Sequence, residues 1–481
     1  MNARHFTLGR VALLAGVAIA SGCSDNNNSS AAPTVTFSSP ATASAINYGQ
    51  SLTLSWTSTN AASCTASTVS GGGSFTGSQS ITGSASVAPA PSAFPASVNY
   101  TLSCTGPGGT TSATSPTITV NPNILSTLST FTTIGSTYDT AAGGFNPYGL
   151  AIAPASQGLI SKGDLIVCNF NNNSPFPGGT QGSGTTIVGL HSTPAANAGG
   201  NPYSIANSAE LQGCNALALL PDDSISASAF GPNLNPLVSA SGVVNNPFAA
   251  DSFGQPWGEA YVPANASQSL PALYISNVSG TIDRITLNES AGGDTQAGFT
   301  EIAAGFCGSG VPGAIFAPSG LTYDPSIDTL YIVDTSSYSV VAFAKVSAIG
   351  QDGVVVNGNC TAAGGATPTP QPTFSGPSGS SATVIANGGQ FNAPISAALL
   401  SDGDLVVSNG DINNPAVTNL AFEISPALGF VGAPVQFDTG NPGALFGMAA
   451  TVDANGNQLI YFNDDNLAGS NNFNTVNLLS K

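Results

Sequence analysis

The chain has 481 residues, of which only 6% are charged, and 24 Asp and Glu stand against 6 Lys and Arg. This excess of acid argues against nucleic acid as a partner, because binding it depends on many cationic contacts to phosphate. With 57 Gly, 33 Pro and almost no stretch that sets apolar residues against a charged helical face, the composition predicts an all-β protein rich in turns.

The first residues carry cations and no acid, and an apolar run from 11 to 20 follows. The run is about half the roughly 20 residues that span a bilayer, so it indicates a signal peptide, residues 1–22, instead of a transmembrane helix. Ala20-Ser21-Gly22-Cys23 resembles the bacterial lipobox. The resemblance implies cleavage before Cys23 and acyl chains, palmitate among them, on its thiol. The alternative is an ordinary secretory site with an incidental cysteine.

A lipid on Cys23 would hold the exported protein at a membrane of the cell envelope. Ser24, where an aspartate would signal retention, resembles outer-membrane sorting in enteric bacteria. Residues 23–32 are small and polar with nothing to bury, which predicts a flexible tether.

From 33 to 121 short β-forming runs alternate with turn clusters, which predicts a β-sandwich. The segments LSWTSTNAASCTAS and YTLSCTGPGG resemble bacterial Ig-like domains. Trp56 comes before the first cysteine of the pair, so a Cys64–Cys104 bridge would link neighbouring strands instead of the two sheets. We expect Trp56 to belong to the core.

The rest of the chain, 122–481, repeats one pattern. Five copies open with an apolar strand entered through Pro or Gly, and these strands are PYGLAIAP (147–154), PWGEAYVP (256–263), PSGLTYDP (318–325), APISAALLSDG (393–403) and LFGMAATVD (445–453). A second strand follows and ends at Asn or Asp, and these residues are Asn169, Asn277, Asp334, Asn409 and Asn463.

A sixth, weaker copy begins at CNALALLP, and Ala229 replaces its Asn or Asp. The last copy has only three strands, so we expect STFTTIGSTY (129–138) to complete it and close a ring. The repeat resembles that of NHL propellers, which run from a Pro-x-Gly-Leu entry to a strand ending in Asp. This resemblance implies a β-propeller, and six copies predict six blades. Together with the resemblance at 33–121, the expected fold is all-β, an Ig-like sandwich followed by a β-propeller.

In such a fold the loop before each first strand and the hairpin after each second strand emerge on one face. That face would carry Tyr148, Trp257 and Phe446, together with the five repeated Asn and Asp residues. The Asn and Asp side chains are typical of turn caps, which bond the backbone nearby, and they remain candidate ligands. Tyr148 and Trp257 could either pack or stack on a sugar or peptide.

Six cysteines remain besides Cys23, which in an exported protein predicts three disulfides. The order of the strands places Cys168 at the end of one second strand and Cys214 at the start of the next first strand. Cys307 and Cys360 flank the copy that begins at 318. We therefore expect Cys168–Cys214 and Cys307–Cys360 in addition to the bridge in the sandwich.

Catalytic signals are weak. His191 is the only histidine after residue 22 and has no GxSxG nearby, so we expect it to be an exposed structural residue. No motif implies a cofactor. Calcium is the one ion that the oxygen-rich loops NFNNN (169–173), NGDINN (409–414) and FNDDN (462–466) could hold.

Two interpretations follow. The favoured one is a lipid-anchored envelope protein without catalytic activity, whose propeller is a binding or scaffold module for a protein or glycan. The alternative is a calcium-dependent hydrolase or lactonase acting in the channel of the propeller. Convergence of carboxylates from different blades in that channel would favour the enzyme.

Overall fold

The structure is a computed structural model, in which residues 1–29 and several internal segments are not described. The internal gaps are 49–50, 69–70, 90, 92–95, 122, 173–179, 198, 200, 249–251, 291–292, 312–313, 359, 361–369, 389–390, 411–418, 427–429, 433, 439–444 and 466–473. The predicted signal peptide and Cys23 therefore lie outside the described residues. Among those that are described, no helix is long and apolar enough to cross a membrane.

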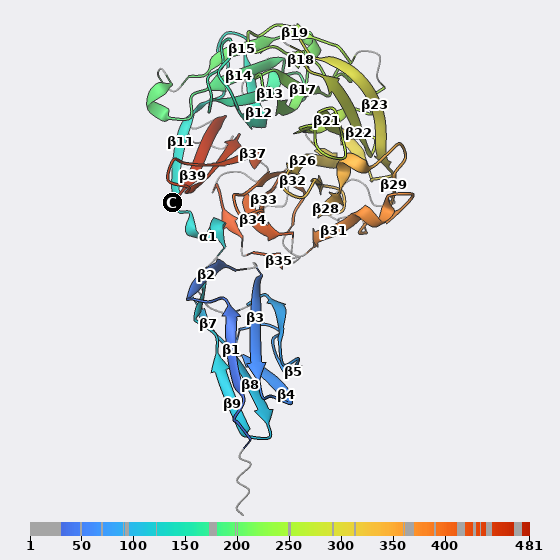
Figure 1. The fold of residues 1–481 in the computed structure, drawn as a ribbon. Coiled ribbons are helices and arrows are strands. Elements are labelled where there is room, and N and C mark those ends of the chain that lie inside the picture. Colours follow the sequence, from blue (N-terminus) through green and yellow to red (C-terminus); the bar gives the residue numbers. More distant parts are fainter. Residues whose placement is uncertain are drawn as a thin grey trace, which may run out of the picture. The chain divides into compact units, whose positions relative to one another are not determined.

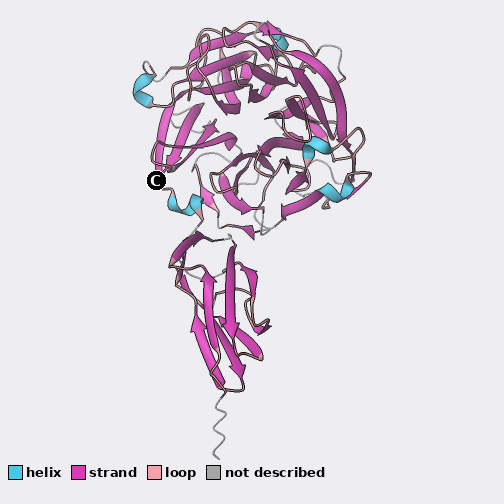
Figure 2. Ribbon diagram, viewed as in Figure 1, coloured by secondary structure: helices cyan, strands magenta, loops and turns pink. Residues whose placement is uncertain are grey.

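The chain divides into two compact units. The first contains most of residues 33–121, and the second contains Thr119–Lys481 with two short earlier segments, Ala45–Leu52 and Ala88–Ser97. Both units are built almost wholly of strands (Figure 2).

The first unit has two antiparallel sheets, β1 (Thr34–Ser39), β3 (Leu52–Thr59) and β6 (Gly83–Val87) in one and β5 (Gly77–Gln79), β4 (Ser63–Thr68), β8 (Tyr100–Gly106) and β9 (Gly109–Thr114) in the other. Three short strands, β2 (Ser44–Asn47), β10 (Ile118–Asn121) and β7 (Ala96–Val98), form a separate sheet, and most of their residues are assigned to the second unit. Trp56 from β3 and Tyr100 from β8 both pack their rings edge-on against Phe75. The two sheets therefore form a sandwich around an aromatic core. As expected, Trp56 is buried in it.

Six sheets of four or more strands lie in the second unit among its described residues, and we call them blades 1 to 6. Blade 1 has β12 (Gly144–Ile152), β13 (Leu165–Asn172), β14 (Thr186–Leu190) and β15 (Tyr203–Asn207). Blade 2 has β16 (Cys214–Leu219), β17 (Ile225–Ala229), β18 (Leu237–Val238) and β19 (Val244–Asn245). Blade 3 has β20 (Pro256–Val262), β21 (Ala272–Asn277), β22 (Thr281–Asn288) and β23 (Thr295–Ala304).

Blade 4 has β26 (Pro318–Asp324), β27 (Thr329–Asp334), β28 (Ser339–Ala344) and β31 (Ala382–Asn387). Blade 5 has β32 (Pro394–Leu399), β33 (Leu405–Asn409), β34 (Leu420–Ser425), β35 (Phe430–Val431) and β36 (Val435–Gln436). Blade 6 has β37 (Leu445–Val452), β38 (Gln458–Asp464), β39 (Thr475–Ser480) and β11 (Thr130–Ser136), and the short helix α1 (Ile124–Thr127) precedes β11.

The blades form a closed ring (Figure 1), because each first strand contacts the first strands of the blades before and after it, and β37 contacts β12. This architecture is a β-propeller. The ring closes where β11 pairs antiparallel with β39, so the segment predicted at 129–138 does complete the last blade. In a closed ring the inner edge of each blade faces the axis, where it is protected from pairing with another chain.

One feature was not predicted. The insertion after β28 of blade 4 crosses to blade 3, where β29 (Val354–Asn357) pairs in parallel with β23, and β30 (Thr373–Ser375) pairs with β29. A hairpin of β24 (Ser309–Val311) and β25 (Ala314–Phe316) connects blades 3 and 4. Blade 3 is therefore extended by strands from the next repeat.

Three disulfides join the cysteine pairs that we expected. Cys64 lies directly opposite Cys104 on the neighbouring strands β4 and β8. Cys168–Cys214 links blade 1 to blade 2, and Cys307–Cys360 fastens the insertion to the start of the β24–β25 connection.

The entry pattern of the repeat corresponds to a β-bulge. In all six blades the register between the first and second strands shifts at the second or third residue of the entry, as between Pro147 and Leu150 or between Pro256 and Gly258. Such bulges increase twist and redirect side chains. The bulged strand can therefore curve around the axis of the propeller.

The third residue of each entry must be small because it faces the next blade. A Cβ on Gly258 would lie 1.8 Å from the carbonyl oxygen of Ser319, and one on Gly447 would lie 2.2 Å from that of Tyr148. Ala216 and Ser396 occupy the same position in blades 2 and 5. The blades thus meet backbone to backbone near the axis.

We expect Gly258→Ala to lower the free energy of unfolding by about 1–3 kcal/mol, because its methyl group would overlap the backbone carbonyl oxygen of Ser319. The measurement is urea unfolding followed by circular dichroism. Gly350→Ala is the matched control, since a Cβ there has nothing within 4 Å. Equal stability of the two variants would refute this account of blade contact.

Candidate functional site

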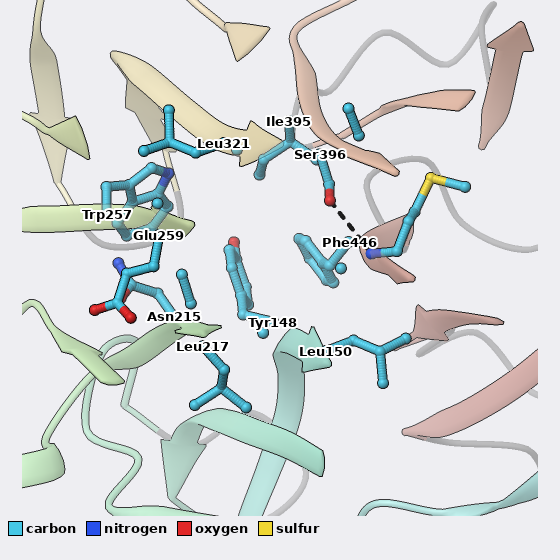
Figure 3. A pocket seen from close by; sticks show the side chains of 17 residues that line it. Tyr148, Leu150, Asn215, Leu217, Trp257, Glu259, Leu321, Ile395, Ser396 and Phe446 are labelled. Atoms are coloured by element: carbon cyan, nitrogen blue, oxygen red, sulfur yellow. Dashed lines mark hydrogen bonds between the residues drawn. The ribbon is translucent and has the colours of Figure 1, made fainter. Parts of the chain in front are cut away.

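The six first strands surround a cavity of about 90 Å³ on the axis of the propeller (Figure 3). Each blade contributes the residues around its bulge, and the lining includes Tyr148, Asn215, Trp257, Glu259, Ser396 and Phe446. The sequence predicted that a ligand would bind, or a reaction would take place, in this part of the propeller.

The aromatic residues of the site pack against one another. The ring of Tyr148 stacks on Phe446 with centroids 4.0 Å apart and meets the ring of Trp257 edge-on at 5.7 Å. Phe170 and Phe230 complete the group, and Ile315 from β25 belongs to the same buried cluster. Tyr148 and Trp257 are only 5% and 4% exposed, so of the two roles left open by the sequence the structure shows packing.

The repeated Asn and Asp residues are also buried, and their side chains bond the backbone or neighbouring side chains. Asn277 accepts a hydrogen bond from the backbone N–H of Gly254, and Asn409 accepts one from that of Asn392. Asn463 donates to the carbonyl oxygens of Tyr148 and Gly149 across the ring closure. Asn169 and Asp334 are equally enclosed. These side chains hold the loops of the propeller in place.

Two polar residues stand where the other blades carry mainly apolar ones. Asn215 in blade 2 replaces the aromatic residue of the entry, and Glu259 in blade 3 replaces Leu, Met or Ala. Figure 3 shows both side chains on the same side of the cavity. The sequence signal for both residues is their departure from the repeat, which is visible when the six entries are compared position by position, and neither was predicted as a site residue.

Glu259 lies between blades 2 and 3, 6% exposed. Its Oε1 accepts a hydrogen bond of 3.0 Å from Ser228, whereas Oε2 has no partner. Burial raises the pKa of this carboxyl to about 8, and hydrogen bonds from Ser228, Ser226 and Asn235 only partly oppose the rise. Glu259 is therefore protonated at neutral pH.

Carboxylates from different blades do not converge in the channel among the described residues. One group of three acids with metal-binding spacing, Asp402, Asp404 and Glu423, lies wholly in blade 5, beside the β32–β33 turn. Both oxygens of Glu423 accept backbone N–H groups, from Ile124 and Leu125 of α1. Burial raises the pKa of Asp404 to about 7 and that of Glu423 to about 8.

This acidic group is a poor fit for calcium. The ion needs ionised oxygens that are free to turn toward it, whereas Glu423 already caps α1 and its pKa favours a proton.

His191 lies apart from the channel, in the connection between β14 and β15. Its Nδ1 is 2.8 Å from Oδ1 of the buried Asp164, and the hydroxyl of Tyr203 donates to the other oxygen of that carboxyl at 2.6 Å. The imidazole is 41% exposed. It is the exposed structural residue that the sequence predicted.

No protein-family model matches the chain, and a search of the curated proteins finds no relative. Solved structures do resemble it. A gluconolactonase from Xanthomonas campestris is 12% identical with a TM-score of 0.42, covering 73% of this chain and 89% of its own. A streptogramin B lyase is 12% identical with a TM-score of 0.39, covering 75% of this chain and 100% of its own.

Regucalcin from Agrobacterium tumefaciens, a calcium-binding protein, is 14% identical with a TM-score of 0.41, covering 73% of this chain and 95% of its own. At these values the likeness assigns no activity.

The raised pKa of Glu259 predicts a pH-dependent stability. The folded protein keeps a proton that the unfolded chain releases near pH 4.5, so the contribution is present below pH 4.5 and is lost as the pH rises through about 8. We expect Glu259→Gln to reduce the loss of stability between pH 6 and pH 8.5 by on the order of a few kcal/mol. Urea unfolding at both pH values measures it, and an unchanged pH dependence in the variant would contradict the assignment.

Proposed function

We propose that this chain is a lipid-anchored cell-envelope protein whose propeller binds a partner without catalysing a reaction. The observation that carries the proposal is the lining of the channel. It includes Tyr148 and Trp257, which belong to a buried aromatic cluster, and Glu259 is the one carboxyl that lines it among the described residues. A lone protonated acid offers neither a metal cage nor a pair of acid and base groups.

A protein fits this molecule better than a glycan as the partner. Glycan recognition by stacking needs exposed aromatic faces, and Tyr148 and Trp257 are both buried. The opposite face of the propeller is formed by the turns between first and second strands and between third and fourth strands. It carries exposed apolar side chains. Leu159, Val243 and Ile327 lie in such turns with exposed fractions of 51%, 56% and 57%.

The same face is acidic. A hollow of about 280 Å³ between blades 2 and 3 is lined by Asp222, Glu289 and Asp294 together with Pro221 and Ser290. Exposed aliphatic side chains beside carboxylates suit a protein surface that carries apolar and basic side chains. We therefore place the proposed binding surface on this face of the propeller.

The anchor is supported by the sequence alone. The segment ASGC ending at Cys23 follows an apolar run that is too short to span a bilayer, and residues 23–32 would connect the acylated cysteine to the first unit. Two or three acyl chains give stable membrane binding. Electrostatic attraction to anionic lipids could not do so, because the chain has few basic residues.

A calcium-dependent hydrolase or lactonase is the second candidate. The acidic group in blade 5 is the observation in its favour. Enzymes occur among the similar structures, but likeness at that level concerns the fold, so this candidate depends on those three acids. Their bonds to α1 and their raised pKa values oppose it.

We expect Cys23→Ser to move the protein from the membrane fraction to the soluble fraction, because the serine hydroxyl receives no diacylglycerol. Fractionation of cells that express each form, followed by immunoblotting, measures the shift. Cys23→Ala serves as a second variant. Retention of both in the membrane fraction would refute the lipid anchor.

A photo-crosslinking amino acid at Ile327 is expected to give one discrete protein adduct in intact cells, weakened by added salt because the surface is acidic. Leu159→Asp should reduce its yield, since it removes an apolar contact on the same face. Val355, exposed on β29 at the outer edge of blade 3, is the control position. Adducts at Val355 alone, or at neither position, would contradict the proposed surface.

A further inference from the structure

The seam between blades 6 and 1, where the ring closes, is bound by a network of polar side chains. After β11 the chain turns at Thr137 and enters β12. The side-chain nitrogen of Asn169 donates to the carbonyl oxygen of Thr137 at 2.9 Å, and Thr137 N–H donates to the carbonyl oxygen of Asn474 at 2.7 Å. Asn474 Oδ1 in turn accepts the N–H of Asn146 at 2.6 Å. Residues from both ends of the propeller are thus joined.

Three side-chain oxygens in this seam are buried without a hydrogen-bond partner. They are Oδ2 of Asp139, Oδ1 of Asn146 and Oδ1 of Asn169, on residues that are 5%, 3% and 0% exposed. Oδ1 of Asp139 accepts the N–H groups of Ala141 and Ala142, which leaves only Oδ2. A buried acceptor without a partner destabilises the folded state, and an unpaired carboxylate does so more strongly.

A fourth such oxygen, Oδ1 of Asn463, lies at the end of β38 on the other side of the closure. Among the described residues, no Lys or Arg forms an ion pair with Asp139. The seam also holds one buried donor without a partner, Nδ2 of Asn474, so unpaired acceptors outnumber unpaired donors by four to one among its described residues. This excess of acceptors calls for an external donor or a cation.

The chemistry of these groups selects the cation. They are one carboxylate and neutral amide oxygens, which hard cations prefer, and calcium accepts such sets in irregular geometry, whereas magnesium demands a near-ideal octahedron. A soft metal would need thiolate or imidazole ligands. The six cysteines of the two units are in disulfides, and His191 is bonded to Asp164 elsewhere.

We propose that the seam binds a calcium ion through the side-chain oxygens of Asp139, Asn146 and Asn169. The ion bridges the turn that follows β11 to β13 of blade 1, and so reinforces the closure made by the β11–β39 pairing. This inference is independent of the proposed binding function and of the acidic group in blade 5.

Asn146→Gly provides a sharp test. Asn146 has a backbone φ of 63°, a conformation that glycine adopts without strain, so the variant removes one oxygen while the backbone is retained. We expect isothermal titration calorimetry of the purified full chain to show calcium affinity at least tenfold lower than in the wild type. The melting temperature in EDTA should change little.

Asp139→Asn should abolish the calcium-dependent rise in melting temperature, because it removes the single charge of the site. Asp402→Asn is the matched control, since it changes an acid of the blade 5 group and should leave the rise intact. If Asp139→Asn fails to fold, the calcium affinity of Asn146→Gly tests the proposal by itself. Absence of calcium binding in the wild type, or wild-type affinity in Asn146→Gly, would overturn the proposal and leave water as the occupant.

Discussion

The close approach of six first strands around one axis is the constraint on which the propeller depends. Adjacent blades meet backbone to backbone at Gly149, Gly258, Gly320 and Gly447, where a Cβ would overlap the neighbouring blade. Each first strand bulges at the same place, which lets it curve past its neighbour. The cavity that remains is small, and the residues that flank each bulge determine its chemistry.

That chemistry is mostly apolar, and polar groups are used to hold the scaffold. Asn277, Asn409 and Asn463 bond loops and neighbouring strands, and the aromatic residues of the entries pack into one buried cluster. Exposed aliphatic side chains and acids occur instead in the turns of the opposite face. This division is the reason for proposing a binding surface on the turns of that face.

Much of the fold could be predicted because its determinants are local and repeated. The Pro-x-Gly entries and the second strands ending in Asn or Asp recur along the chain, and pairing Cys168 with Cys214 needs only the order of the strands. The insertion after blade 4 could not be placed in the same way. Its strand β29 joins blade 3, a pairing between segments about 50 residues apart that no local pattern encodes.

The sequence by itself determined the class of fold, the repeat, the segment that closes the ring and the pairing of six cysteines, since each depends on residue type and spacing. Only the tertiary structure decided which polar and aromatic side chains are buried. The position of Trp257 in the repeat is compatible with exposure or burial. Its ring is buried because Tyr148 and Phe230, from other blades, pack against it. The pKa of Glu259 and the unpaired oxygen of Asp139 likewise arise from neighbours distant in the chain, because burial is a property of the assembled ring.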